Sequence, residues 1–349
     1  MIESSPDYGG GPKDLAREVI QKDRCAVCGA CVGLCPYFIQ AEGRVRPRDL
    51  CNLDQGRCWA FCPMAGARRA FEGELGGHRE IFIAQSTQRD FRRKGQYGGV
   101  VSTLVWTALN QGLVKEAVLT GGDPENAPRG VRVSDRRSIL AAAGSRYAAS
   151  GAVAVLNQAL TEDKNRDLAL VGTPCQIKAA AAMRAAEGPA MGFDPHRIKV
   201  LIGLFCTWAL DHRRLNEYLR TMLFGERAVA YDIPPPPADV FQVFTSDGIK
   251  AFPLDEIRPL RLNACRFCDD MTSVRADVSV GSVEGLSGWN TVIVRTDVGE
   301  RLIESALARK LLRTGVLPEM DLDHLKEAAA LKKERGLSAL AQNMEQPSQ

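Results

Sequence analysis

The sequence has few histidines, few aromatic residues and no long apolar run. Only four of the 349 residues are histidine, and 6% are aromatic. None of the histidines lies in a cluster motif, so the sequence does not favour a histidine-based active site. No stretch approaches the roughly 18 apolar residues of a membrane span, and we therefore expect none. The net charge of +3 is small, which favours neither a nucleic-acid partner nor a membrane partner.

A secretory signal is also missing from the start of the chain. The first residues, MIESSPDYGGGPKDL, are acidic and polar where such a signal has a basic start and an apolar run. The chain nevertheless contains eleven cysteines. Cysteines at close spacing without an export signal indicate a reducing compartment, and we expect a cytoplasmic protein without a disulfide framework.

Seven of the cysteines lie between residues 25 and 62, and four of them form one tight run. It reads Cys25-Ala-Val-Cys28-Gly-Ala-Cys31-Val-Gly-Leu-Cys35-Pro36, the C-x₂-C-x₂-C-x₃-C-P pattern of bacterial ferredoxins. A tight turn lets the first three thiolates bind one iron–sulfur cube, while the fourth cysteine binds the other cluster of a pair. A zinc site is the alternative, although zinc usually takes two closely spaced pairs of ligands.

The second half of this segment is less regular. It keeps the closing Cys58-Trp-Ala-Phe-Cys62-Pro but has Asp54 where a middle cysteine would stand. The crossed pairing of ferredoxins assigns the cysteines to two sets. The first thiol group is Cys25, Cys28, Cys31 and Cys62, and the second thiol group is Cys35, Cys51 and Cys58. The second group is one ligand short of a 4Fe-4S site. Asp54 or water could complete it. The alternatives are that it holds a cluster of three irons, or that no cluster binds and Cys51 is a buried thiol.

Beyond residue 77 the pattern changes to alternating strands and helices. Apolar strands are expected at Glu80–Ala84, Ala117–Thr120, Leu168–Val171, Lys199–Leu204, Val278–Gly281 and Thr291–Arg295, and helices at Val100–Gln111, Ala152–Leu160, Gln176–Ala185 and Gly299–Ala308. Such alternation predicts an α/β domain with a mixed, largely parallel sheet. Residues 85–99 are expected to form a loop, and Phe241–Phe252 a hairpin.

These patterns predict four segments. They are an N-terminal arm (1–20), an α+β two-cluster ferredoxin-like 4Fe-4S domain (21–77), the α/β domain (78–320), and a charged C-terminal helix with a polar tail (321–349). Gly76-Gly77 is the expected hinge between the two domains.

Four cysteines remain, and they form the third thiol group: Cys175, Cys206, Cys265 and Cys268. Two of them follow apolar strands, and strand ends in an open parallel sheet meet at the edge where ligands bind. This placement predicts a further cluster inside the α/β domain. The alternative is that Cys175 and Cys206 are small buried apolar residues and the remaining pair stands alone.

With these motifs the chain resembles a known family, the beta subunits of coenzyme F420-reducing hydrogenases and dehydrogenases. The matching stretches beyond the N-terminal cysteines are Gly95-Gln-Tyr-Gly-Gly99 with Ser102-Thr103-Leu104, Gly144-Ser-Arg-Tyr147, Val171-Gly-Thr-Pro-Cys-Gln176, Gly203-Leu-Phe-Cys206, Cys265-Arg-Phe-Cys-Asp-Asp270 and Arg275-Ala-Asp-Val-Ser-Val-Gly281. The resemblance implies an FAD-binding α/β domain with its own 4Fe-4S cluster on the third thiol group. It also implies electron transfer between coenzyme F420 and the iron–sulfur chain of a partner catalytic subunit, such as a hydrogenase or a formate dehydrogenase.

A flavin site can also be argued from the residues. Gly98 and Gly99 precede a helix whose free amides and dipole suit a pyrophosphate, with hydroxyls from Ser102 and Thr103. The remaining candidates are Ser145, Tyr147, Gly172, Thr173, Pro174 and Gly281, with Arg295 as a phosphate contact or a surface ion pair. No catalytic acid or base is assigned, because a bound flavin would itself exchange single electrons for hydride.

The sequence therefore predicts an iron–sulfur flavoprotein with FAD and two to three 4Fe-4S clusters. Two alternatives remain. One is a flavin reductase that acts directly on an organic substrate with electrons from ferredoxin. The other is an electron-wiring subunit that holds clusters but no flavin.

Overall fold

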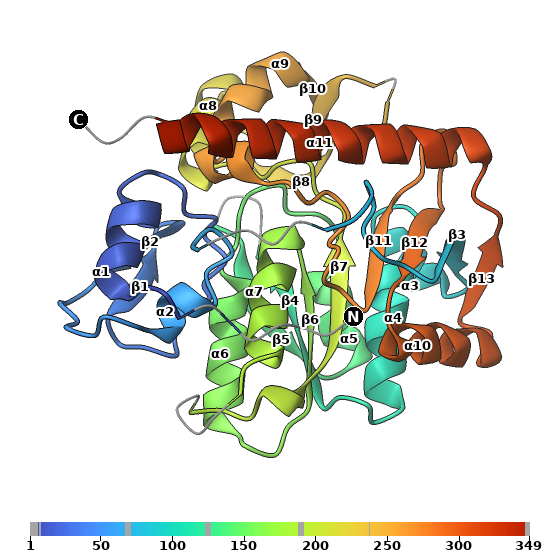
Figure 1. The fold of residues 1–349 in the computed structure, drawn as a ribbon. Coiled ribbons are helices and arrows are strands. Elements are labelled where there is room, and N and C mark those ends of the chain that lie inside the picture. Colours follow the sequence, from blue (N-terminus) through green and yellow to red (C-terminus); the bar gives the residue numbers. More distant parts are fainter. Residues whose placement is uncertain are drawn as a thin grey trace.

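A computed structural model describes residues 6, 8–66, 71–122, 127–187, 192–236 and 238–345. Figure 1 shows an N-terminal unit on one side of a larger α/β unit, a small sheet above both, and a long C-terminal helix that crosses the molecule. Within the described ranges, the strands form sheets of two, three and eight members. No helix in these ranges is long and apolar enough to span a membrane.

The eight-stranded sheet is the centre of the fold, with the order β13-β3-β12-β11-β7-β6-β4-β5. Its strands are β3 (Glu80–Ser86), β4 (Glu116–Gly121), β5 (Arg129–Val133), β6 (Leu168–Gly172), β7 (Ile198–Leu204), β11 (Val278–Ser282), β12 (Asn290–Val294) and β13 (Leu312–Gly315). The pairs β11–β7, β7–β6 and β6–β4 are parallel, and the remaining pairs are antiparallel. The predicted mixed sheet is therefore confirmed, but the expectation that it is largely parallel is wrong, because only the pairs among β11, β7, β6 and β4 are parallel.

Helices cover both faces of this sheet. One face carries α4 (Val100–Asn110), α5 (Arg136–Ala142) and α10 (Asp297–Ala308), and the other carries α6 (Ala152–Glu162) and α7 (Pro174–Arg184). Because both faces are covered, every residue of β6 is buried, as expected for a central parallel strand. The predicted loop at residues 85–99 is wrong in part, because it contains the short helix α3 (Arg89–Lys94).

The N-terminal unit is built around a small apolar core. Its elements are α1 (Pro12–Leu15), the π-helical turn η1 (Ala16–Ile20), the antiparallel pair β1 (Phe38–Ala41) and β2 (Arg44–Pro47), and α2 (Arg57–Ala60). Leu15 and Val19, in the segment expected to be an arm, are buried in the same core as Phe38 and Val45. The ferredoxin-like two-cluster fold and the segment boundaries stay predictions.

The three-stranded sheet lies above the carboxyl ends of the central strands (Figure 1). It consists of β8 (Ala228–Asp232), β9 (Val240–Thr245) and β10 (Gly248–Pro253), and packs with α8 (His212–Met222), α9 (Leu254–Ile257) and the 3-10 turn η4 (Arg258–Leu260). The predicted hairpin is confirmed, because β9 and β10 pair antiparallel around the turn at Ser246 and Asp247.

The junction between the N-terminal and α/β units is anchored to the sheet. The Arg295 guanidinium donates hydrogen bonds to the carbonyls of Leu75 at 2.9 Å and Gly77 at 3.0 Å. A Cβ at Gly76 would lie 2.7 Å from Cγ1 of Val274. Gly76 therefore permits close packing and a positive φ of 69°, and the hinge at Gly76-Gly77 stays a prediction.

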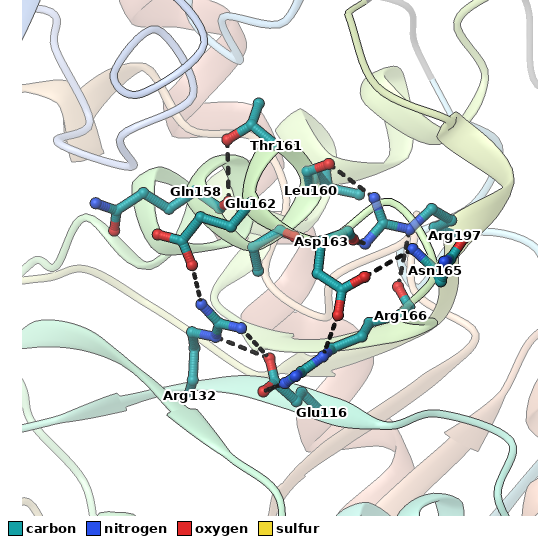
Figure 2. Close-up of polar contacts among 11 residues, drawn as sticks. Glu116, Arg132, Gln158, Leu160, Thr161, Glu162, Asp163, Asn165, Arg166 and Arg197 are labelled. Atoms are coloured by element: carbon teal, nitrogen blue, oxygen red, sulfur yellow. Dashed lines mark hydrogen bonds and ion pairs between the residues drawn. The ribbon is translucent and has the colours of Figure 1, made fainter.

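The amino ends of the parallel strands are held by ion pairs (Figure 2). Glu116, the first residue of β4, is buried between Arg132 and Arg166, and its Oε2 lies 2.6 Å from Nη2 of Arg132. Arg197 is buried nearby, and its guanidinium donates to backbone carbonyls, including that of Leu160 at 2.7 Å. These contacts are structural, and they lie at the edge opposite the cysteines that follow β6 and β7.

Candidate functional site

The carboxyl edge of the parallel strands brings distant cysteines together. Cys175 lies in the first turn of α7, directly after β6, and Cys206 follows β7 by two residues. Cys265 lies in the 3-10 turn η5 (Asn263–Phe267), and Cys268 is the residue that ends it. The amide of Cys206 donates to the carbonyl of Met271 at 2.9 Å, which joins the strand end to the segment that follows η5.

The four residues of the third thiol group are half-buried, and their thiols act on one another. Burial raises the pKa of Cys175 to about 12, and the neighbouring Cys268 and Cys265 raise it further. Burial also raises the pKa of Cys206, Lys332 opposes this shift, and the other three thiols add to it. The amide of Ala209 donates to Sγ of Cys265 at 3.3 Å. The structure thus brings together all four residues that the sequence pattern grouped.

Lys332 is a neighbour of this group that sequence reasoning missed. It lies in α11 (Glu319–Glu345), is 3% exposed, and its Nζ donates to the carbonyl of Cys206. Burial lowers the pKa of Lys332, but the thiols of the third group and Asp270 outweigh it, so the net pKa is raised. The available signal was the small residues Ala329 and Gly336, which mark the buried face of an otherwise charged helix.

In the first thiol group Cys28 is buried, and Cys25, Cys31 and Cys62 are half-buried. Burial raises the pKa of Cys25 to about 12, and Cys62 adds to the shift. Burial raises the pKa of Cys28 and Cys31 well above the usual value, and both are raised further by Cys62. The sequence-based grouping of Cys62 with the earlier run is therefore matched by their proximity.

In the second thiol group Cys51 and Cys58 are buried, and Cys35 is half-buried. Burial raises the pKa of Cys58 to about 11, and both Cys35 and Cys51 contribute to the increase. Cys51 is buried, whereas Asp54 is exposed. A role for Asp54 as the missing ligand stays a prediction.

The three groups form a continuous series. Cys58 of the second group also raises the pKa of Cys31 and Cys62, although burial and other nearby groups have larger effects on these pKa values. Cys175 of the third group is the main contributor, after burial, to the raised pKa of Cys28. Among the described residues, no group of three or more His, Cys, Asp and Glu side chains is arranged so that it could hold a metal ion.

The glycines before α4 have a packing role. Gly99 has φ of 69° and is the N-cap of α4, and a Cβ at Gly98 would lie 2.6 Å from Oδ1 of Asn290. The Val100 amide donates to the same Asn290 oxygen at 3.3 Å. Ser102 is buried, and the buried hydroxyl of Thr103 bonds Ser86 at 2.6 Å and the Gly99 carbonyl at 3.0 Å. Part of this helix terminus is thus already bonded within the protein.

Two predicted flavin residues belong to one polar network. The Tyr147 hydroxyl donates to Oδ1 of Asp232 at 3.0 Å and accepts from Nε2 of Gln96 at 2.8 Å. The Ser145 hydroxyl donates to Oε1 of Gln96. Burial and the Asp232 carboxylate raise the pKa of Tyr147. This network joins the loop before α4 to β8 of the small sheet, a connection that the sequence did not indicate.

The other predicted positions lie at the carboxyl edge. Gly172 ends β6, Thr173 is the N-cap of α7, and Pro174 begins that helix. The Thr173 hydroxyl lies 3.3 Å from Sγ of Cys175. A Cβ at Gly281 would overlap the Phe205 ring at 1.9 Å, so this glycine makes room for Phe205.

Arg295 differs from both readings made from the sequence. It is 5% exposed, and its Nε donates to the Ser279 hydroxyl at 2.8 Å. Its other donors bind the carbonyls at the anchored junction, and one binds the Thr272 carbonyl at 3.1 Å. Arg295 is therefore a buried structural residue, and neither a phosphate contact nor a surface ion pair.

Comparison with known proteins agrees with this geometry. Residues 81–157 match the family described as coenzyme F420 hydrogenase/dehydrogenase, beta subunit N-term, and residues 165–319 match the corresponding C terminus. The coenzyme F420 hydrogenase subunit beta of Methanothermobacter thermautotrophicus is 31% identical over 280 residues, which are 78% of this chain and 97% of the relative. A subunit of the F(420)H(2) dehydrogenase of Methanosarcina mazei is 30% identical, over 82% of this chain and 83% of the relative.

A solved structure is also similar. A chain of the xenon-derivatized F420-reducing NiFe hydrogenase complex from Methanosarcina barkeri superimposes with a TM-score of 0.71 at 26% identity, covering 78% of this chain and 95% of that chain. Sequence and structure thus agree over most of both chains. The chain belongs to the family of beta subunits of coenzyme F420 hydrogenases and dehydrogenases, and it is an oxidoreductase.

Proposed function

We propose that this chain is an iron–sulfur flavoprotein subunit that moves electrons between a partner oxidoreductase and coenzyme F420. The three thiol groups each hold a cluster, and FAD binds near the third group at the carboxyl edge of the sheet. FAD, when bound, supplies the exchange between the single electrons of clusters and the hydride of a two-electron coenzyme.

The observation that carries this proposal is the series of thiol groups. Eleven cysteines fall into three groups, and neighbouring groups are close enough for their thiols to act on one another. A structural metal site needs one such group, whereas a path for electrons needs several in succession. The series leads from the N-terminal unit to the carboxyl edge, where ligands bind in α/β sheets.

The donor set supports iron–sulfur clusters. Thiolates are the ordinary ligands of such clusters, and the buried Lys332 supplies a positive charge beside the third group. The protein's own contribution is to hold these ligands, to keep water from them and to fix their spacing. Cys175 and Cys206 are held by the turns after β6 and β7, which makes the sheet itself the frame of the third group.

The names of the relatives suggest the partners. The hydrogenase subunit beta and the dehydrogenase subunit are both named for coenzyme F420, and the similar solved chain belongs to a hydrogenase complex. We propose that this chain likewise joins a catalytic subunit, such as a hydrogenase or a formate dehydrogenase. Ferredoxin is the alternative diffusible partner, with an organic substrate in place of coenzyme F420.

One observation favours a flavin-free electron-wiring subunit. The Val100 amide, the Thr103 hydroxyl and the Ser145 hydroxyl already have partners within the protein. They offer less to a pyrophosphate than the sequence predicted, and a chain without FAD would pass only single electrons. This second candidate is separated from the first by flavin content.

Anaerobic purification with assays of iron, zinc and flavin tests the proposal. Three 4Fe-4S clusters correspond to about twelve iron atoms per chain, and we expect these with one FAD and reduction of coenzyme F420 when the clusters are reduced. Iron without flavin, even after reconstitution with FAD, would support the wiring role. Flavin and iron without turnover of coenzyme F420 would support a reductase of another substrate. Zinc in place of iron would contradict the coenzyme F420 subunit, the wiring subunit and the reductase alike.

A further inference from the structure

We propose that Lys332 raises the reduction potential of the cluster on the third thiol group by holding a positive charge beside it. This inference rests on the proposed function, because it requires a cluster there. Lys332 is a positioning residue and not a catalytic residue, because its charge acts on the potential of the cluster and its side chain takes no part in the reaction.

The helix that carries Lys332 is placed for this role. The C-terminal family match ends at residue 319, and α11 begins at Glu319, so nearly all of the helix lies beyond the matched region. Figure 1 shows α11 crossing above the carboxyl ends of the central strands. Gly336 lets it approach closely, because a Cβ there would lie 2.6 Å from the carbonyl oxygen of Cys268. One helical turn earlier, Lys332 donates to the carbonyl of Cys206.

Within the described part of the chain, the buried charge of Lys332 is opposed by a carboxylate that also acts on Arg295. The side chain is 3% exposed, and a buried ammonium is costly unless opposite charge compensates it. The buried Asp270 carboxylate, which accepts from the Val274 amide at 3.0 and 3.3 Å, acts on both Lys332 and Arg295, so one negative charge faces two positive charges. The other groups that act on Lys332 are the thiols of Cys206, Cys265 and Cys268. A negatively charged cluster on these thiols would provide the missing compensation.

The direction of the effect follows from electrostatics. A cubane cluster bound by four thiolates is negatively charged when oxidised, and it gains one more negative charge when it accepts one electron. A fixed positive charge therefore stabilises the reduced form more than the oxidised form, and net charge is one of the factors that set cluster potentials. The effect is large where water is excluded, because burial weakens screening.

The test is a potentiometric titration of the anaerobically purified full chain, followed by electron paramagnetic resonance. The signal of the third group is identified as the one that Cys206→Ser removes. Lys332→Met removes the charge and keeps most of the volume, Lys332→Arg keeps the charge, and Lys333→Met is the matched control. Lys333 is the next residue of the same helix, but its Nζ binds the carbonyls of Phe71 at 2.7 Å and Gly73 at 2.9 Å.

We expect Lys332→Met to lower the ratio of reduced to oxidised cluster at least tenfold at a fixed potential, a shift of about 59 mV for a one-electron couple. The Lys332→Arg and Lys333→Met variants should stay within about twofold of the unaltered chain, or about 18 mV on the same scale. A residue that only anchors α11 would change stability and leave the potential in place.

An unchanged potential in Lys332→Met overturns the inference and leaves the proposed function intact. If the unaltered chain shows no signal that depends on Cys206, the proposed function fails and the inference fails with it. If Lys332→Met does not assemble the cluster, Lys332→Gln is titrated in its place, and a normal potential there overturns the inference. If Lys332→Met and Lys332→Gln both lose the cluster and Lys332→Arg keeps it, the result supports the inference, because the cluster then requires the positive charge. If Lys332→Arg also loses the cluster, the inference is overturned.

Discussion

The amide of Val153 donates a 3.0 Å hydrogen bond to the carbonyl of Cys28. This bond joins the first turn of α6 to the loop that carries the first thiol group. After burial, Cys175 of the third group contributes most to the raised pKa of Cys28. The bond to α6 therefore holds the N-terminal unit at the place where the first and third groups are near each other.

Asn157 is expected to be a major attachment point of the cysteine loop. It is fully buried, and its Nδ2 donates to the carbonyls of Val32 at 2.6 Å and Ala30 at 3.1 Å. Asn157→Ala would leave buried carbonyls without a donor, which costs about 1–3 kcal/mol. We expect this loss in the free energy of unfolding, together with faster release of iron. The exposed neighbour Gln158 is the control, and Gln158→Ala should stay within about 0.5 kcal/mol; equal losses in both variants would contradict the prediction.

Gly29 is expected to tolerate no side chain. Its φ is 87°, and a Cβ would lie 2.7 Å from the amide nitrogen of Ala154 in α6. Gly29→Ala therefore combines left-handed strain of about 1–2 kcal/mol with a backbone clash, and should displace the loop and lower iron content. Gly43→Ala is the matched control, because Gly43 has φ of 70° but its nearest contact would be 3.8 Å away. Similar unfolding free energies for the two variants would show that the approach to α6 is unimportant.

The ion pairs at the amino edge should affect stability without affecting electron transfer. Glu116 is buried between two arginines (Figure 2), so Glu116→Gln should lower the free energy of unfolding by about 1–3 kcal/mol. Glu162→Gln is the control, since the Glu162 side chain is 55% exposed and its pairing with Arg132 is worth at most about 1 kcal/mol. Denaturant unfolding measures the difference. Reduced turnover per folded molecule in Glu116→Gln would contradict the separation of the two edges.

The third thiol group should be separable from the N-terminal clusters. Cys268→Ser removes one of its ligands, and we expect loss of coenzyme F420 reduction while the spectral signals of the first and second groups persist. Cys35→Ser is the complementary variant and should remove the signal of the second group alone. Electron paramagnetic resonance of the reduced proteins measures both, and simultaneous loss of all signals in Cys268→Ser would show that the groups do not form separate units.

Short-range spacing and strand ends accounted for much of the site. Cys25, Cys28 and Cys31 of the first group could be grouped because they are close in sequence, and Cys175 and Cys206 could be paired because parallel strands end at one edge. The edge strands β5 and β13 escaped detection, since Arg129–Val133 and Leu312–Gly315 mix arginine and glycine with few apolar residues. Lys332 was missed because a lysine in a charged helix looks solvated, and the small residues Ala329 and Gly336 were the only sign in the sequence that this face is buried. Arg295 was misread as a phosphate contact or a surface ion pair because the sequence does not show that tertiary packing buries the residue after β12.

Anomalous scattering at the iron absorption edge, measured on crystals of the anaerobically purified chain, tests the central claim most directly. The account predicts an iron peak enclosed by the sulfurs of Cys175, Cys206, Cys265 and Cys268, with separate peaks at the first and second thiol groups. Iron at the N-terminal cysteines with none among these four sulfurs would contradict it.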